Sequence, residues 1–355
     1  MARLDVLLKA ARDMGASDLH VLSGYTPVLR IQGEIQPVDF QVITGDQCRK
    51  LLYEIMSEEQ VGRLESNGDC DFSYEIPGEL RVRANVFEQN QGISAALRLL
   101  PAQTFTLEQL GLPLAISRFA EMDRGLVVVT GPPGSGKSAT LAALIDYINT
   151  TQRKHIISLE DPIEYLHTNK QSIVNQREIG RHAPSFSAGL RAALREDPNI
   201  IMVGEMRDSE TISLALTAAE IGQLVFGTLH TPNAAQTVNR IIDAFPSGEQ
   251  DQVRAVLADS LQGVVAQRLI RTPDGSGRTP AVEIMFVTQA VRVMIREKKT
   301  FQIQSAMQTG KKEGMQLMED SLQQLVREGK VTAEEAGITP SGMKKPTVSP
   351  RGLVA

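Results

Sequence analysis

The chain has 355 residues, which is longer than one small domain and suggests two or three domains. Its hydrophobic content of 42% and charged content of 22% are those of an ordinary globular protein, and no apolar run approaches the ~18 residues of a membrane span. A formal net charge of −5 with 4% aromatic residues argues against a protein whose main surface follows a nucleic-acid backbone.

The first hundred residues mix helices with short alternating strands, and we predict an α+β domain over residues 1–100. The opening stretch, Leu4 to Met14, predicts a charged amphipathic helix and not an export signal, so we expect a cytoplasmic protein. Strand patterns occur at Val28 to Gly33 and around Leu80 to Leu100, and a helix pattern occurs near Gly45 to Met56. The two cysteines, Cys48 and Cys70, are too far apart for a C-x-x-C pair and fit buried thiols.

A linker is expected over residues 101–113, and a second domain over 114–287. In this domain apolar runs alternate with helical stretches, which favours a largely parallel sheet with helices on both faces. The candidate strands are Leu126 to Val129, Ile156 to Leu159, Ile200 to Val203 and Leu224 to Leu229. Polar residues follow each of these strands, where open α/β sheets bind ligands.

The C-terminal third is predicted to be mainly helical. An apolar stripe predicts one helix from Gln250 to Ile270, followed by a strand from Val282 to Val287. Two further helices, Gln289 to Thr309 and Met315 to Gly329, make a small unit over residues 288–337. The tail, 338–355, is rich in Pro, Ser, Lys and Gly and has the composition of a disordered segment.

A phosphate-binding loop is the most specific motif of the chain. It has the G-x-x-x-x-G-K-S pattern, a strand feeds it, and a helical stretch leaves it. In such a loop glycines turn backbone N–H groups toward the phosphates, the lysine spans the β- and γ-oxygens, and the serine hydroxyl reaches Mg²⁺. The motif therefore predicts ATP and Mg²⁺ as cofactors. Its residues are Gly131, Pro132, Pro133, Gly134, Ser135, Gly136, Lys137 and Ser138.

Three carboxylates follow the second candidate strand, and each is a candidate general base. Glu160, Asp161 and Glu164 compete for this role, and the residues alone do not decide among them. Glu205 comes directly after the strand Ile200 to Val203 and Gly204, at the position of a Walker B carboxylate, which would hold the metal with Ser138. A strand-end glutamate without chemistry is the alternative.

His230 stands at the end of the strand Leu224 to Leu229 and is a candidate for contacting a γ-phosphate, although a lone strand-end histidine is more often structural. Phosphoryl transfer also requires a positive group near the developing charge. The candidate arginines, Arg81, Arg83 and Arg98, lie in the first domain. In a ring of subunits such an arginine reaches a neighbour's nucleotide.

Five motifs in order give the chain a family resemblance. They are the phosphate loop, ISLEDPIE at 157–164, LREDP at 194–198, VGEMRD at 203–208 and GTLHT at 227–231. This set resembles the secretion ATPase superfamily, and within it the type IV pilus retraction ATPases, over nearly all of residues 1–337. ASDLH at 16–20 and AVRVMIRE at 290–297 look like the N-terminal motif and the C-terminal retraction motif of that family.

The resemblance implies a fold and a set of roles. The fold is an N-terminal PAS-like domain and a RecA-like ATPase domain in a homohexamer at the cytoplasmic base of the pilus, on the inner membrane. Glu164 becomes the catalytic base, Glu205 the metal-side carboxylate and His230 a catalytic histidine. The arginines of the first domain would contact nucleotide. The functional motif of retraction would include Arg292, Arg296 and Glu297.

This chain departs from the family pattern at several positions. Pro133 and Ala139 replace usual threonines in the phosphate loop, and Gln223 replaces a second histidine of the family. Neither change in the loop removes a phosphate-binding group. A solvated stripe is the alternative for Arg292 and Arg296, which share a helix face at i, i+4 spacing.

The predicted function is ATP hydrolysis that powers pilus retraction and twitching motility, with a membrane platform protein as partner. An accessory, PilU-like retraction paralogue is one alternative, and a hexameric DNA translocase or a small-molecule kinase is another. A secretion or assembly ATPase is disfavoured because those carry a four-cysteine zinc insertion.

Overall fold

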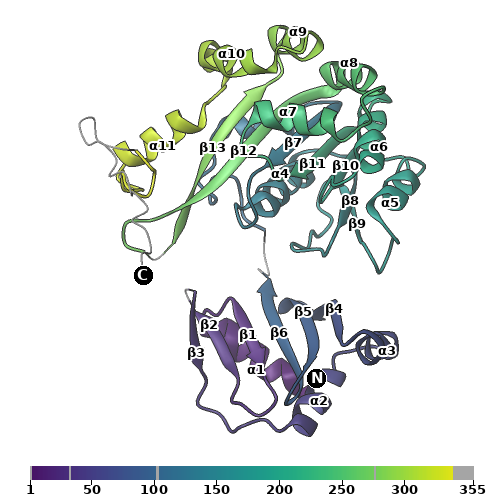
Figure 1. Cartoon of the computed structure of the whole chain (residues 1–355), viewed down its shortest axis with the longest axis vertical. Helices are drawn as coiled ribbons and strands as arrows, with labels where there is room; N and C mark the ends of the chain where they lie inside the picture. Colours follow the sequence, from purple (N-terminus) through teal and green to yellow (C-terminus); the bar gives the residue numbers. More distant parts are fainter. Residues whose placement is uncertain (1, 32, 101–103, 276, 339–355) are drawn as a thin grey trace, which may run out of the picture.

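The computed structural model describes residues 2–31, 33–100, 104–275 and 277–338. It contains two sheets, each with its own hydrophobic core, and these form two separate bodies in Figure 1. Among the described residues no helix is both long and apolar enough to cross a membrane. The predicted tail lies outside the described residues from 339 onward.

The N-terminal body is a six-stranded antiparallel sheet with three helices. The strand order is β3-β2-β1-β6-β5-β4. The strands are β1 Asp18–Val21, β2 Val28–Ile31, β3 Glu34–Pro37, β4 Asp69–Ile76, β5 Leu80–Gln89 and β6 Gly92–Leu100. The helices are α1 Arg3–Asp13, α2 Gly45–Tyr53 and α3 Glu58–Asn67. Capping boxes led by Thr44 and Ser57 start α2 and α3, and both cysteines are buried free thiols.

The second body is built on a seven-stranded sheet of order β13-β12-β7-β11-β10-β8-β9. The strands are β7 Gly125–Thr130, β8 His155–Glu160, β9 Ile173–Glu178, β10 Ile200–Val203, β11 Leu224–Leu229, β12 Leu261–Arg271 and β13 Arg278–Phe286. Neighbouring strands are parallel except at the β12–β13 hairpin. Every residue of β7, β10 and β11 is buried, as expected for a parallel sheet covered on both faces.

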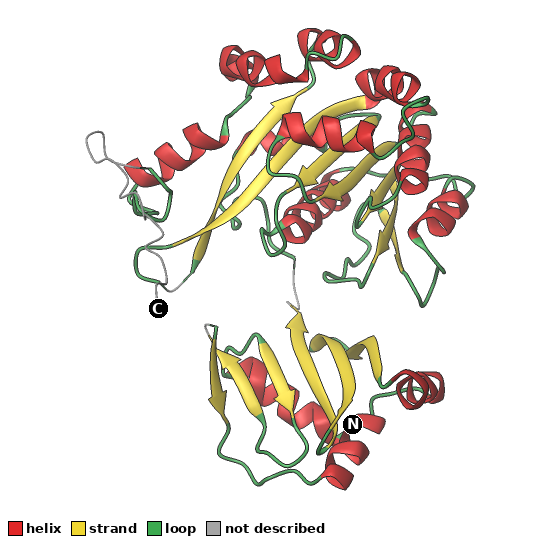
Figure 2. Cartoon of the chain, viewed as in Figure 1, coloured by secondary structure: helices red, strands yellow, loops and turns green. Residues whose placement is uncertain are grey.

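Helices surround this sheet, as Figure 2 shows. The α-helices are α4 Lys137–Thr151, α5 Phe186–Ala193, α6 Ser209–Glu220, α7 Ala234–Asp243, α8 Gln250–Ser260, α9 Gln289–Arg296, α10 Ile303–Thr309 and α11 Met318–Arg327. Short 3₁₀ helices are η1 Leu114–Phe119, η2 Thr300–Gln302 and η3 Gly310–Glu313. The predicted fold class is confirmed: an N-terminal α+β domain precedes an α/β domain with a parallel sheet and a small helical end.

Two predicted helices were wrong. The stretch Gln250 to Ile270 is not one helix, because α8 ends at Ser260 and β12 begins at Leu261. The apolar stripe continues across this junction because the first part of β12 lies between β7 and β13 and is buried on both faces. The stretch Gln289 to Thr309 is also divided, since Lys298 has a φ of 62° and the chain turns there between α9 and α10.

Part of the predicted linker packs into the second body. Residues 101–103 lie outside the described part, but Leu107 and Leu112 are buried in the core of the seven-stranded sheet. Sequence reasoning also missed β9, an edge strand that pairs in parallel with β8. Only two of its six residues are buried, and such partial burial gives a weak apolar signal.

Candidate nucleotide-binding and active site

The phosphate loop leaves the carboxyl end of β7, an inner strand between β12 and β11, and enters α4 at Lys137. The φ values of Gly131, Gly134 and Gly136 are 146°, 73° and 87°, and residues other than glycine rarely adopt such positive φ values. A Cβ on Gly131 would lie 2.2 Å from the carbonyl oxygen of Gln267. Close packing against β12 therefore fixes the loop, and the glycines are required by geometry.

A cavity of about 390 Å³ opens at this edge of the sheet. Residues from the carboxyl ends of four parallel strands line it, in agreement with the rule for open α/β sheets. They include Lys137 and Ser138 of the loop, Glu160, Asp161 and Glu164 after β8, Glu205 after β10, and His230 after β11. The structure thus brings together the catalytic and metal-binding candidates of the sequence.

Lys137, His230, Glu205 and Arg207 form a chain of polar contacts across the cavity. The Lys137 ammonium lies 3.3 Å from His230 Nδ1, and His230 Nε2 lies 3.0 Å from Glu205 Oε1. The other oxygen of Glu205 pairs with Arg207 at 2.7 Å. Lys137 also donates to the carbonyl oxygens of Gly131 and Pro132, at 2.9 and 3.2 Å. The lysine therefore occupies the centre of the loop, where a phosphate would sit.

The surroundings of Lys137 and Glu205 shift the pKa values of both side chains. Burial lowers the pKa of Lys137, and the charges of Glu205 and Glu164 oppose this effect. Burial alone would raise the pKa of Glu205, but the hydrogen bond and charge of Arg207, with His230, hold it below its ordinary value. Glu205 is therefore ionised at neutral pH, which is the form that a metal ligand requires.

The three competing carboxylates have different surroundings. Glu160 is buried, and burial raises its pKa to about 7 although Ser158 and Gln176 donate hydrogen bonds to it. Asp161 is exposed and faces the charge of Arg207. Glu164 is partly buried, and its negative charge favours the charged form of Lys137. No hydrogen bond or ion pair to its carboxylate occurs among the described residues. Glu164 and Asp161 both have acceptor oxygens free to take a proton from water, but Glu164 lies near Lys137 of the phosphate loop whereas Asp161 lies near Arg207.

The arginines of the N-terminal domain point to three different places. Arg83 lines the cavity of Lys137. Arg81 is buried and pairs with Glu178 at 2.6 Å. Arg98 pairs with Asp18 at 3.0 Å and lines a different, larger cavity of about 1060 Å³. In this structure, therefore, neither Arg81 nor Arg98 lines the cavity of Lys137, and their predicted contacts to nucleotide remain predictions.

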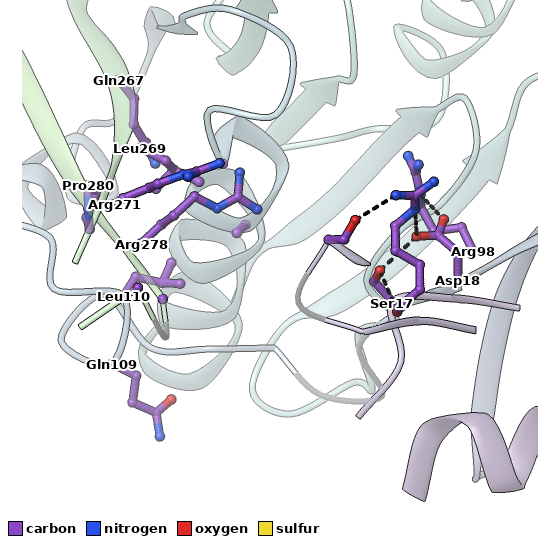
Figure 3. Close-up of a pocket in the computed structure, with 16 residues that line it drawn as sticks. Ser17, Asp18, Arg98, Gln109, Leu110, Gln267, Leu269, Arg271, Arg278 and Pro280 are labelled. Atoms are coloured by element: carbon purple, nitrogen blue, oxygen red, sulfur yellow. Dashed lines mark hydrogen bonds and ion pairs between the residues drawn. The ribbon is translucent and has the colours of Figure 1, made fainter. Parts of the chain in front are cut away.

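The larger cavity borders the other side of the phosphate loop, through Gly136 and Ala139 (Figure 3). Arg271 and Arg278 lie side by side in Figure 3 and face each other across the β12–β13 hairpin. Like charges at directly opposite positions are unfavourable unless an anion lies nearby. Sequence reasoning missed this pair, although a Pro-Asp-Gly-Ser-Gly turn between two apolar runs would have predicted the hairpin.

The three positions at which this chain departs from the family pattern lie in different surroundings. Pro133 is exposed and lines the smaller cavity, whereas Ala139 lines the larger one. Gln223 precedes β11 at its amino end, while His230 follows the carboxyl end. The six residues of β11 lie between them, so seven steps along a strand separate their Cα atoms by ~23 Å and Gln223 does not belong to the same site.

The predicted retraction motif has a defined structural setting on α9. Arg292 donates to the carbonyl oxygens of Ala258 and Asp259, at 2.7 and 2.6 Å, and Arg296 pairs with the Asp259 carboxylate. Glu297 pairs with Lys299 at 2.7 Å. Arg292 thus caps the end of α8, Arg296 pairs with a side chain of that helix, and the two arginines are not a freely solvated stripe. A role in retraction remains a prediction.

This fold and site define a P-loop nucleotide-binding protein of the RecA-like type. The sequence profile of the family described as "Type II/IV secretion system protein" matches residues 3–338, and the chain belongs to this family. The chain is 48% identical over 330 residues to "Type IV pilus retractation ATPase PilT" of Pseudomonas aeruginosa, covering 93% of this chain and 96% of that protein. It is 37% identical over 330 residues to "Type IV pilus ATPase PilU" of the same organism, covering 93% and 86%.

A solved structure gives the same result. The "Crystal Structure of the Pilus Retraction Motor PilT and Bound ADP" superimposes with a TM-score of 0.88 at 47% identity, covering 96% of this chain and 98% of that chain. The resemblance predicted from the motifs is therefore confirmed.

Proposed function

We propose that this protein is a hexameric motor ATPase that hydrolyses ATP to retract type IV pili. The supporting observation is the convergence of Lys137, Glu164, Glu205 and His230 on one cavity at the end of the central strands. This is the set of groups that phosphoryl transfer to water requires: a phosphate cradle, a base, a metal-side carboxylate and a polar contact to the γ-phosphate. The identity to the PilT protein supports pilus retraction as the work performed.

ATP and Mg²⁺ fit the residues present. The glycine conformations turn the loop into a cradle, and the Lys137 ammonium already binds carbonyl oxygens where phosphate oxygens would replace them. Ser138 and Glu205 line the same cavity and offer the oxygen ligands that Mg²⁺ prefers. When bound, Mg²⁺ would neutralise charge on the phosphate oxygens. The ribose and base would extend past Gly136 and Ala139 into the larger cavity, near Arg271 and Arg278.

Each of these residues of the cavity then has a role in hydrolysis. Glu164 accepts the proton of the attacking water, and Lys137 holds the phosphate that departs. His230 connects Lys137 to Glu205, so loss of the terminal phosphate changes a contact that reaches Arg207. We propose that this change, repeated around the ring, moves the domains and returns pilin subunits to the membrane through the platform protein. The protein would act in the cytoplasm at the inner-membrane base of the pilus.

The first experiment measures ATP hydrolysis by the purified full chain and by four variants. We expect Glu164→Gln to bind ADP normally and to lose at least about 100-fold in kcat, because removal of a general base costs this much. Lys137→Ala should weaken ADP binding itself. Asp161→Asn and Glu160→Gln are the matched controls for the choice of base, and each should retain most of the turnover. Normal turnover in Glu164→Gln would remove the assignment of the base.

The second experiment measures pilus retraction in a strain that lacks every retraction paralogue and carries this chain. Restored retraction supports the motor, whereas ATP hydrolysis without retraction would identify an accessory protein. Strong stimulation of hydrolysis by DNA would instead indicate a translocase.

A further inference from the structure

Glu178, the last residue of β9, connects the two domains of the chain. It is buried, and a single oxygen, Oε2, accepts three hydrogen bonds. Two of them come from the N-terminal domain, from Arg81 at 2.6 Å and from the Ser73 hydroxyl at 3.2 Å. The third comes from the backbone N–H of Ile163 at 3.2 Å. One carboxylate therefore holds both the N-terminal sheet and the loop after β8.

Ile163 precedes Glu164, the proposed base, in a loop without regular structure of its own. β9 supplies the support for this loop from one face, because Gln176 and Glu178 are two residues apart in a strand. The Gln176 amide donates to the Tyr165 carbonyl oxygen at 2.8 Å and accepts from the N–H of His167 at 2.8 Å. The residues before and after Glu164 are thus both attached to β9.

Glu178 provides the nearest negative charge to the buried guanidinium of Arg81. Its side chain is about as buried as that of Glu178, at 8% exposure each, and its other carboxylate contact, to Glu75, is longer at 3.7 Å. Its Nε atom has no hydrogen-bond partner among the described residues. A buried charge is costly without a partner, so Arg81 and Glu178 each favour the domain arrangement in which they meet.

We propose that Glu178 is a positioning residue that couples the placement of the N-terminal domain to the placement of the catalytic loop. With Arg81 and Ser73 in contact, Glu178 is held where it accepts the Ile163 N–H, and Glu164 is presented to the attacking water. When the N-terminal domain moves away, Glu178 loses its cation and turns toward water, and the loop loses this anchor. This inference rests on the proposed hydrolysis and extends it, because hydrolysis then occurs only in subunits with the domains in contact.

The test measures kcat, the KM for ATP and the Kd for ADP of purified full-length variants. We expect Arg81→Met and Glu178→Gln each to lower kcat on the order of tenfold, because a misplaced reacting group costs this much or more. In Glu178→Gln, KM and Kd should stay within about twofold, since Lys137, the phosphate loop and the arginines of the N-terminal domain are untouched. Arg81→Lys keeps the charge and should recover part of kcat. Arg177→Met is the matched control: Arg177 lies on the opposite face of β9 and pairs with Glu196, so its loss should leave kcat unchanged.

The double variant Arg81→Met/Glu178→Gln distinguishes a unit from two separate effects. If the two residues act as one unit, the double variant loses no more in kcat than the worse single variant. Multiplied losses, or in Glu178→Gln an unchanged kcat or a rise of KM in step with the fall of kcat, would each overturn the proposal. If Arg81→Met does not fold, Glu178→Gln alone decides, because it keeps the acceptor and the side-chain volume. Absent hydrolysis in the unmodified protein would instead refute the proposed function.

Discussion

Glu160 is a buried carboxyl group at the end of β8 whose pKa is raised to about 7, first because of burial. A carboxyl with a folded-state pKa above its unfolded value stabilises the protein in its neutral form. This stability is fully present below the ordinary pKa of 4.5 and is lost as the pH rises through about 7. Glu160 should therefore weaken the fold as solutions become neutral, which is the opposite of an ion-paired carboxylate.

The Glu160→Gln variant tests this behaviour. Glutamine keeps the shape and still accepts hydrogen bonds from Ser158 and Gln176, but it does not ionise. We expect the denaturation midpoint of the unmodified protein to fall between pH 5 and about pH 8, relative to that of the variant. Urea unfolding at matched pH values measures the difference. Parallel pH profiles of the two proteins would show that Glu160 does not titrate in this range.

At the scale of secondary structure, α8 and α9 are joined through a helix end. The last carbonyl groups of α8 have no hydrogen-bond donors within the helix. The Arg292 guanidinium replaces these donors, since it donates to the carbonyl oxygens of Ala258 and Asp259. Its second nitrogen also reaches Gln262, at the start of β12, at 3.2 Å. A cation at a helix C-terminus also interacts favourably with the helix dipole. Arg292 thus fixes the point where α8 turns into β12.

We expect Arg292→Ala to lower the free energy of unfolding by about 1–3 kcal/mol, because it leaves two carbonyl groups without a charged donor. Arg292→Lys should recover only part of this, since one ammonium does not reproduce the planar fork of the guanidinium. Chemical denaturation measures the loss. Arg296→Ala is the comparison, because its ion pair to Asp259 is exposed and should contribute less than about 1 kcal/mol. Equal losses in the two variants would contradict the capping role.

Some of these elements could be predicted from the sequence and others could not. The phosphate loop was predictable because its glycines and lysine have few alternatives at that spacing, and the four buried strands were predictable from their apolar runs. The α8–β12 junction was not, because helix periodicity and a strand buried on both faces give similar apolar patterns over ten residues. Arg81 and Glu178 are 97 positions apart in the chain, and only the arrangement of the domains brings them together.

At the scale of the whole molecule, the two sheets have separate apolar cores, and the contacts described between the domains are polar. The N-terminal core contains residues from α1 to β6, while the other core begins at Leu107. The Glu178 contacts to Arg81 and Ser73 join the domains without a shared hydrophobic cluster. Cooperative unfolding depends mainly on shared apolar burial, so the domains should unfold separately.

Calorimetry of the full chain with and without Mg²⁺ and ADP tests this independence. We expect two transitions, and ADP at 100 times its Kd should stabilise only the ATPase domain, by about 2.7 kcal/mol. The N-terminal transition should stay close to its position, because the phosphate loop and every residue that lines its cavity except Arg83 belong to the second domain. In Lys137→Ala the same ADP concentration should move neither transition. A single transition that shifts as a whole would mean that the domains unfold as one unit, and that the polar contacts at Glu178 couple them more strongly than their separate cores indicate.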